Sequence, residues 1–126
     1  MKTKFSFSKN HTSLLLAMVT LILLSTQSTT FAAQCATPTF NPGSSGVRIR
    51  ALQITVSINT TTTGAYLRYT TDGSTPTSSH GTLIQATSGN VTLQYGHGCM
   101  TLKAIAYKAG LVGSAIKTDT YCFDAG

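Results

Sequence analysis

Alternation of apolar and polar residues restricts this chain to a narrow set of folds. Residues 52–58 read LQITVSI, in which every second side chain is apolar. Because successive side chains of a strand point to opposite faces, this pattern predicts a strand with one buried face. The residues expected on that face are Leu52, Ile54, Val56 and Ile58.

Further short segments repeat the pattern along the chain. In AYLRYTT, residues 65–71, it places Leu67 and Tyr69 on one face and Tyr66, Arg68 and Thr70 on the other. In CMTLKAIAYK, residues 99–108, Ile105 and Tyr107 break the alternation, which indicates that both faces are partly covered. The remaining candidates are residues 82–86, 90–95 and 114–123.

No stretch of ten or more residues carries an uninterrupted helical stripe, whereas Thr, Val, Ile and Tyr are plentiful. About seven short strands separated by turns are typical of an antiparallel sandwich. The chain is therefore predicted to be all-β, with one immunoglobulin- or fibronectin III-like β-sandwich.

The N-terminal part follows a different pattern from the rest. Lys2, Lys4 and Lys9 precede an apolar run of 11 residues, LLLAMVTLILL, at positions 14–24. A membrane-spanning helix needs about 20 residues, so the run is too short to span and is typical of a signal peptide. Residues 1–33 are predicted to be that peptide, with cleavage after Ala32 or Ala33, and an uncleaved anchor is the alternative. Residues 34–126 then form one domain in the periplasm or outside the cell, without a membrane span.

The charge of the predicted mature chain excludes one class of partner. Its six basic and three acidic residues give a net charge of +3, and none of them forms a basic run or a basic helix. Nucleic-acid binding is therefore not expected.

A tight turn is predicted in YTTDGSTPT, residues 69–77. The Asp72 carboxylate can accept hydrogen bonds from the amides that follow it, and Gly73 can adopt positive φ without steric cost. Pro76 has no amide donor and forces an extended conformation on the residue before it. Asp72, Gly73 and Pro76 are therefore predicted to be structural.

The string AYLRYTTDGSTPTS, followed by TLKAIAYKAGLVGSAI and a final TY, resembles the chitobiase/beta-hexosaminidase C-terminal domain. The opening ATPTFNPGSSG is similar to the Pro-x-Phe-x-Pro start of that domain, here Pro38, Phe40 and Pro42. The resemblance spans residues 36–123. It implies a fibronectin III-related, non-catalytic module that is usually attached to glycoside hydrolases and serves as a spacer, support or carbohydrate contact. This chain departs from that pattern, because residues 34–126 are predicted to be a single domain without a catalytic domain beside it, and because the chain carries three cysteines.

Catalysis and metal binding find little support in the residues. Glycosidases generally need two carboxyl groups, but the chain has no Glu, and Asp72 is assigned to its turn. A calcium site at Asp72 would need more carboxylates than the single one present locally. His97 and Cys99 lack an orienting partner, and together with His80 they match no metal-ligand spacing. No catalytic residue, metal or cofactor is expected.

Three cysteines leave one without a partner inside the chain. Cys99 opens one predicted strand and Cys122 nearly closes the next, so they are expected to face each other across a hairpin and form a disulfide. Cys35 is then the free cysteine, and its pairing with Cys99 or Cys122 is the alternative.

Aromatic rings on sandwich domains often hold sugars, although such rings can equally complete a core. Tyr66 is the ring expected to be most exposed, beside Arg68, and Tyr95 is a further candidate. We therefore expect a secreted, non-catalytic structural or accessory module that binds polysaccharide or cell-envelope components weakly. The alternative is a protein–protein or envelope-assembly module that is linked through Cys35 or an exposed strand edge.

Overall fold

The computed structural model describes residues 31–44, 48–94, 96 and 98–124, and these contain seven strands and no helix. The fold class predicted from the alternating pattern is therefore confirmed. The strands are β1 (Thr39–Asn41), β2 (Gln53–Asn59), β3 (Tyr66–Thr70), β4 (Thr82–Ile84), β5 (Ser88–Gln94), β6 (Cys99–Tyr107) and β7 (Lys117–Cys122).

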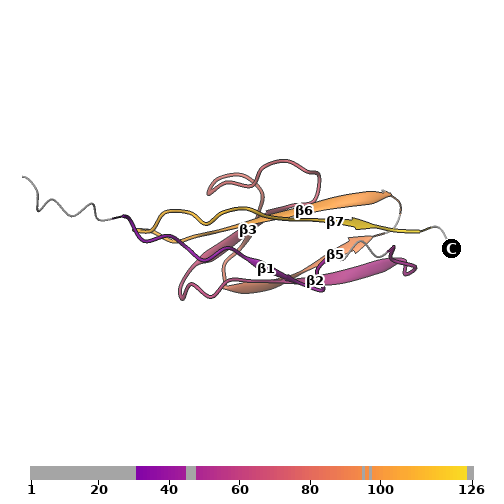
Figure 1. The fold of residues 1–126 in the computed structure, drawn as a ribbon, viewed down its shortest axis with the longest axis horizontal. Helices are drawn as coiled ribbons and strands as arrows, with labels where there is room; N and C mark the ends of the chain where they lie inside the picture. The colour runs from indigo at the N-terminus through magenta and orange to yellow at the C-terminus, as the bar shows by residue number, and fades with distance from the viewer. Residues whose placement is uncertain (1–30, 45–47, 95, 97, 125–126) are drawn as a thin grey trace, which may run out of the picture. The chain divides into compact units, whose positions relative to one another are not determined.

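The strands form two antiparallel sheets that lie face to face as two layers (Figure 1). One sheet has three strands in the order β1-β2-β5, and the other has four in the order β4-β3-β6-β7. The longest pairing joins β2 to β5, with Val56 opposite Val91 at its centre.

The core lies between the sheets and is built from the inward-facing residues of each strand. On β6, Leu102, Ala104 and Ala106 are fully buried, while the residues between them are half-buried. Complete burial of one large aliphatic side chain contributes about 1.5–3 kcal/mol to folding. The other buried core residues on strands include Phe40, Val56, Ile58, Leu67, Val91, Leu93 and Tyr121.

Two expected burial positions were wrong. Leu52 precedes β2 and is 80% exposed, because the buried face of this strand begins only at Ile54. Thr70 was expected on the polar face but is buried at the end of β3, where its hydroxyl donates a hydrogen bond to the Ser74 carbonyl at 2.6 Å. Both residues lie at strand ends, where the alternating pattern no longer determines which face is covered.

The segment before β1 is bound to the domain by its backbone. The Val112 amide donates to the Ala33 carbonyl, and the Cys35 amide donates to the Val112 carbonyl, each at 2.9 Å. Cys35 precedes β1, which begins at Thr39. It lies beside an isolated parallel bridge between Gln34 and Val112.

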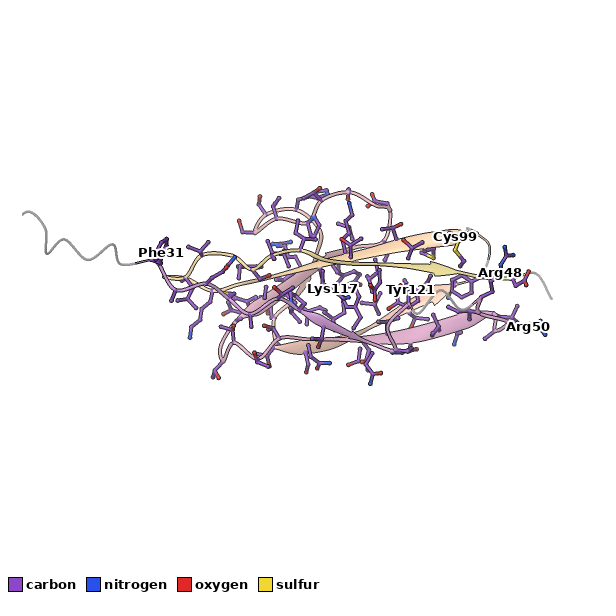
Figure 2. All side chains as sticks on the ribbon, viewed as in Figure 1. Phe31, Arg48, Arg50, Cys99, Lys117 and Tyr121 are labelled. Atoms are coloured by element: carbon purple, nitrogen blue, oxygen red, sulfur yellow. A yellow bond between two sulfur atoms is a disulfide. The ribbon has the colours of Figure 1, made fainter. Side chains whose placement is uncertain are left out.

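Side-chain contacts join the two sheets where β1 and β7 lie near each other. The Tyr121 hydroxyl donates to the Pro42 carbonyl at 2.7 Å, and the Ser44 amide donates to the Asp119 carboxylate at 3.1 Å. The Lys117 ammonium lies 5.8 Å from the centre of the Phe40 ring. Lys117 and Tyr121 are labelled along β7 in Figure 2. These contacts join the first and last strands, which belong to different sheets.

Candidate functional site: a tyrosine-lined groove

A groove of about 680 Å³ lies on the outer face of the four-stranded sheet. Its floor is formed by Tyr66 of β3 and by Ile105 and Tyr107 of β6. These side chains point outward because the intervening residues, Leu67, Ala104 and Ala106, fill the core. The break in alternation on β6 thus marks residues that line this groove. The rest of the lining is Thr75, Pro76, Thr77, Ser78, Lys108, Ala109, Leu111, Gly113 and Ile116.

Tyr66 and Tyr107 form an aromatic pair at the floor of the groove. They are direct cross-strand partners, with ring centroids 5.9 Å apart and ring planes inclined by 41°. Tyr66 is 44% exposed, as expected from the sequence, and Tyr107 is half-buried beside it. Tilted rings at this distance attract each other, which holds both rings in place without a ligand.

Arg68 shares the outer face with Tyr66, but its guanidinium contacts the protein's own backbone. Its Nε donates to the Ser78 carbonyl at 2.9 Å, and its Nη1 donates to the Gly81 carbonyl at 2.7 Å. These bonds hold the loop whose residues 75–78 form one wall of the groove. Arg68 therefore positions the wall, and its predicted contact with a ligand stays a prediction.

Lys108 is the charged residue among those that line the groove. Its ammonium donates a 2.8 Å hydrogen bond to the Thr63 carbonyl, so the charge is directed to the loop before β3. Of the described carboxylates, Asp119 pairs with Lys117 at 3.1 Å and Asp124 with Arg48 at 3.8 Å. The lining thus offers rings, aliphatic side chains and hydroxyl groups to a ligand, and no carboxylate.

The sequence pointed to Tyr66 but did not reveal the rest of the groove. Pro76 was predicted only as a turn residue, yet it is almost fully buried and forms part of the wall. Leu111 and Ile116 reach the groove from the β6–β7 connection, and no local pattern marks them as its lining. Tyr95, a further predicted binding residue, lies outside the described residues.

The Asp72 turn has the predicted geometry. Asp72 Oδ1 accepts hydrogen bonds from the Ser74 hydroxyl at 2.6 Å and from the Ser74 amide at 3.0 Å. These two bonds, the hydroxyl first, lower the pKa of the exposed Asp72 carboxyl below its ordinary value. Gly73 has φ of +83°, a conformation that favours glycine. The carboxylate is engaged within its own turn.

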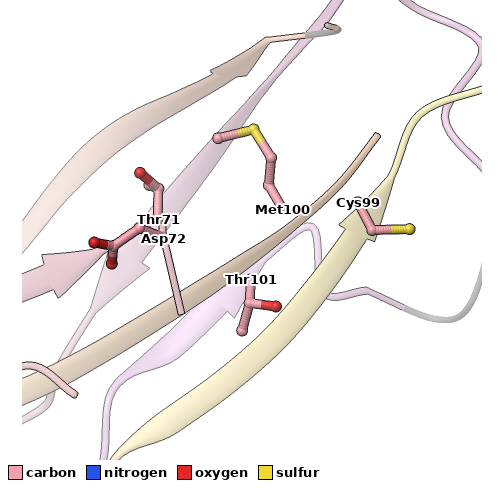
Figure 3. A pocket seen from close by; sticks show the side chains of 5 residues that line it. All are labelled: Thr71, Asp72, Cys99, Met100 and Thr101. Carbon is pink, nitrogen blue, oxygen red and sulfur yellow. The ribbon is translucent and has the colours of Figure 1, made fainter. Parts of the chain in front are cut away.

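A depression of about 390 Å³ beside this turn has no reactive arrangement among the described residues. It is lined by Thr71, Asp72, Cys99, Met100 and Thr101. Figure 3 shows the Asp72 carboxylate and the Cys99 sulfur pointing away from each other. The Cys99 sulfur is moreover bonded to Cys122, so it is not a free thiol.

Ser74 and His80 lie beside Asp72, but their order differs from that of a hydrolase triad. The Ser74 hydroxyl contacts His80 Nε2 at 3.1 Å and also donates to Asp72. In a triad, the carboxylate orients the histidine, which then accepts the serine proton. Here the hydroxyl proton is directed to the carboxylate, so His80 does not receive it. The three side chains stabilise the turn and do not activate Ser74.

The cysteines pair as predicted. Cys99 and Cys122 are register partners on β6 and β7 and form a disulfide. Cys35 is free and only 3% exposed, with its side chain in the core cluster. Its burial counts against the alternative in which Cys35 links this domain to another chain.

The described part of the chain has no group of three or more His, Cys, Asp or Glu side chains arranged to hold a metal ion. Within the same residues, no helix has the length and apolarity to cross a membrane.

Comparison with known families agrees with the sandwich fold. The chain matches the model of the family described as Chitobiase/beta-hexosaminidase C-terminal domain over residues 45–118. This match covers more than half of the chain, which therefore belongs to that family of non-catalytic β-sandwich modules. No curated protein and no solved structure matches the chain significantly.

Proposed function

We propose that this chain is an exported, non-catalytic accessory module that binds carbohydrate weakly through the groove at Tyr66 and Tyr107. The observation that supports this most strongly is the tyrosine pair, with Tyr66 exposed, at the floor of a largely apolar groove. The C–H face of a sugar ring is apolar and packs well on an aromatic ring, while its hydroxyls can bond to groups at the rim. Thr75, Thr77 and Ser78 supply such groups along one wall.

The proposed location outside the cytoplasm rests on the N-terminal sequence and on the disulfide. A structural disulfide is typical of proteins that mature in an oxidising compartment. The Cys99–Cys122 bond and the signal-peptide pattern of residues 1–33 therefore support the same placement, in the periplasm or outside the cell.

Soluble oligosaccharides test the groove. Titration of the secreted chain, followed by NMR shifts of residues 66, 105 and 107, should show binding that Tyr66→Ala weakens about tenfold or more, because the exposed ring surface is lost. Tyr66→Phe, which keeps the ring, should bind within about twofold of the natural chain. Leu83→Ala removes an exposed apolar side chain elsewhere on the same sheet and should have no effect. Equal binding by the natural chain and Tyr66→Ala would refute the groove.

A protein partner is the second candidate, and the end of the four-stranded sheet favours it. β4 is paired on one side with β3 and carries Leu83, which is 38% exposed. An edge strand of this kind can pair with a strand of another protein. If Leu83→Lys abolishes capture of an envelope protein while oligosaccharide titrations stay blank, this function replaces the first.

A further inference from the structure

The outer face of the three-stranded sheet carries an uncharged set of side chains. Its outward positions hold ten hydrogen-bonding residues, and none of the ten is charged. The outer face of the other sheet, in contrast, carries Arg68 and Lys103. The ten residues, called the polar face below, are Thr39, Asn41, Gln53, Thr55, Ser57, Asn59, Ser88, Asn90, Thr92 and Gln94.

The polar face is arranged in ranks across the strands. Gln53 lies opposite Gln94, and Thr55 lies opposite Thr92. Two further ranks continue onto β1: Asn41–Ser57–Asn90 and Thr39–Asn59–Ser88. Neighbouring strands are about 4.8 Å apart, and outward residues repeat about every 7 Å along a strand. The result is a regular two-dimensional array of hydroxyl and amide groups.

Contacts within the array hold several of these groups in place. The hydroxyls of Thr55 and Thr92 are 3.5 Å apart, and the Asn59 amide nitrogen donates to the Ser57 hydroxyl at 3.2 Å. Short side chains on a paired sheet have little conformational freedom to lose when a partner binds. The array is therefore pre-organised for contact with another surface.

We propose that the polar face is a second binding surface, which takes the flat surface of an uncharged, insoluble polysaccharide. Charge selects this occupant: a charged polymer would lose hydration against this face without an ionic bond in return, whereas a neutral polymer has no ionic hydration to lose. The positive charges that could attract an acidic polymer, such as Arg68 and Lys103, lie on the other sheet.

The hydrogen-bonding chemistry of the array also selects a sugar surface. Each Ser, Thr, Asn or Gln side chain both donates and accepts hydrogen bonds, and so does each sugar hydroxyl. The two surfaces can thus satisfy each other in more than one register. A second copy of this domain is less suitable, because ten buried polar groups would need fixed partners, and each one left unpaired costs about 1–3 kcal/mol.

The experiment separates this surface from the groove. The secreted chain with Tyr66→Ala and Tyr107→Ala serves as the background, so that binding through the groove is removed. Sedimentation with microcrystalline cellulose, insoluble β-1,3-glucan and chitin then measures retention on solid, neutral polysaccharides. We expect retention on at least one of them, changing less than about twofold between about 0.05 and 1 M NaCl because no ion pairs form.

A matched pair of variants assigns the retention to the polar face. Thr55→Lys with Thr92→Glu places opposite charges at its centre without changing net charge, and should lower retention about tenfold, because charged groups must be desolvated against the solid. Thr101→Lys with Thr120→Glu makes the same change in a cross-strand threonine pair on the other sheet, where the hydroxyls are 3.2 Å apart. This control should be retained like the background.

Three results would overturn the proposal. The first would be that the background is retained on none of the solids. The second would be that the two charged variants lose retention equally. The third would be that the Thr55–Thr92 variant abolishes dimer formation or ice binding shown by the background. Oligosaccharide binding in the groove is measured on the chain with its tyrosines intact, so failure of one surface leaves the other unaffected.

Discussion

The Tyr121 hydroxyl donates a hydrogen bond to the Pro42 carbonyl at 2.7 Å, across the gap between the two sheets. Tyr121 is 2% exposed and belongs to the core cluster, while its hydroxyl meets the segment that follows β1. Burial, and secondarily the nearby Asp119 carboxylate, raises the pKa of Tyr121 to about 12. The side chain thus contributes to stability as the neutral phenol.

Tyr121 should make the domain less stable at high pH. Its unfolded pKa is about 10, so between about pH 10 and 12 the folded state holds a proton that the unfolded state has lost. The stabilisation from Tyr121 is complete below about pH 10 and is lost as pH rises through about 12. The free energy of unfolding falls by about 3 kcal/mol at most over this range. Tyrosinate absorbance of the natural chain, which has five tyrosines, should show one titrating late. This late component should be missing in Tyr121→Phe, and its persistence would contradict the assignment.

The Cys99–Cys122 disulfide should stabilise the folded domain. It closes a loop across 23 positions, and by the chain-entropy estimate this contributes about 3 kcal/mol. Replacement of both cysteines by serine should lower the free energy of unfolding in urea by about that amount. The natural chain in reducing buffer should behave like the double variant. Cys35→Ser leaves the disulfide intact and should lose as much stability in reducing buffer as the natural chain does. Disulfide-linked dimers of the folded natural chain would show that Cys35 is accessible.

Asp72 should stabilise the turn only while it is ionised. Because the pKa of Asp72 is lowered in the folded state, the folded state binds fewer protons than the unfolded state near this pKa. The stability that Asp72 contributes is therefore present above its unfolded pKa and is lost as pH falls through its folded pKa. Asp72→Asn should therefore lower Tm at neutral pH, and the difference from the natural chain should shrink below about pH 4. An NMR titration of the Asp72 carboxyl carbon in Ser74→Ala should give a higher pKa than in the natural chain. An unchanged pKa would show that Ser74 does not cause the shift.

Arg68 should act through the loop that it holds. Arg68→Lys keeps the charge but cannot reach both the Ser78 and Gly81 carbonyls, and should cost about 1–2 kcal/mol of stability. Hydrogen exchange at the amides of Thr77 and His80, which are bonded within this loop, should become faster. Weaker oligosaccharide binding with unchanged exchange would instead mean that Arg68 contacts the ligand directly.

Local pattern was sufficient to determine much of this protein. Alternation gave the strands and most of the core, since period two places every second side chain on one face. The Asp72–Gly73 turn followed from residue chemistry, because the carboxylate and the glycine favour one local geometry. The pairing of Cys99 with Cys122 followed from their positions at corresponding ends of adjacent strands. Each of these inferences depends on residues close in sequence or on a single hairpin.

Only the tertiary structure decided what lies on the surface. The groove joins β3 and β6 to two loops, and Leu111 and Ile116 become part of it through sheet packing rather than any local pattern. Arg68 binds carbonyls 10 and 13 residues away, so it holds the loop that forms the wall of the groove. The ranks of the polar face depend on the register of β1, β2 and β5. Sequence patterns report which side chains prefer burial, whereas contact between distant strands is set by how whole layers pack.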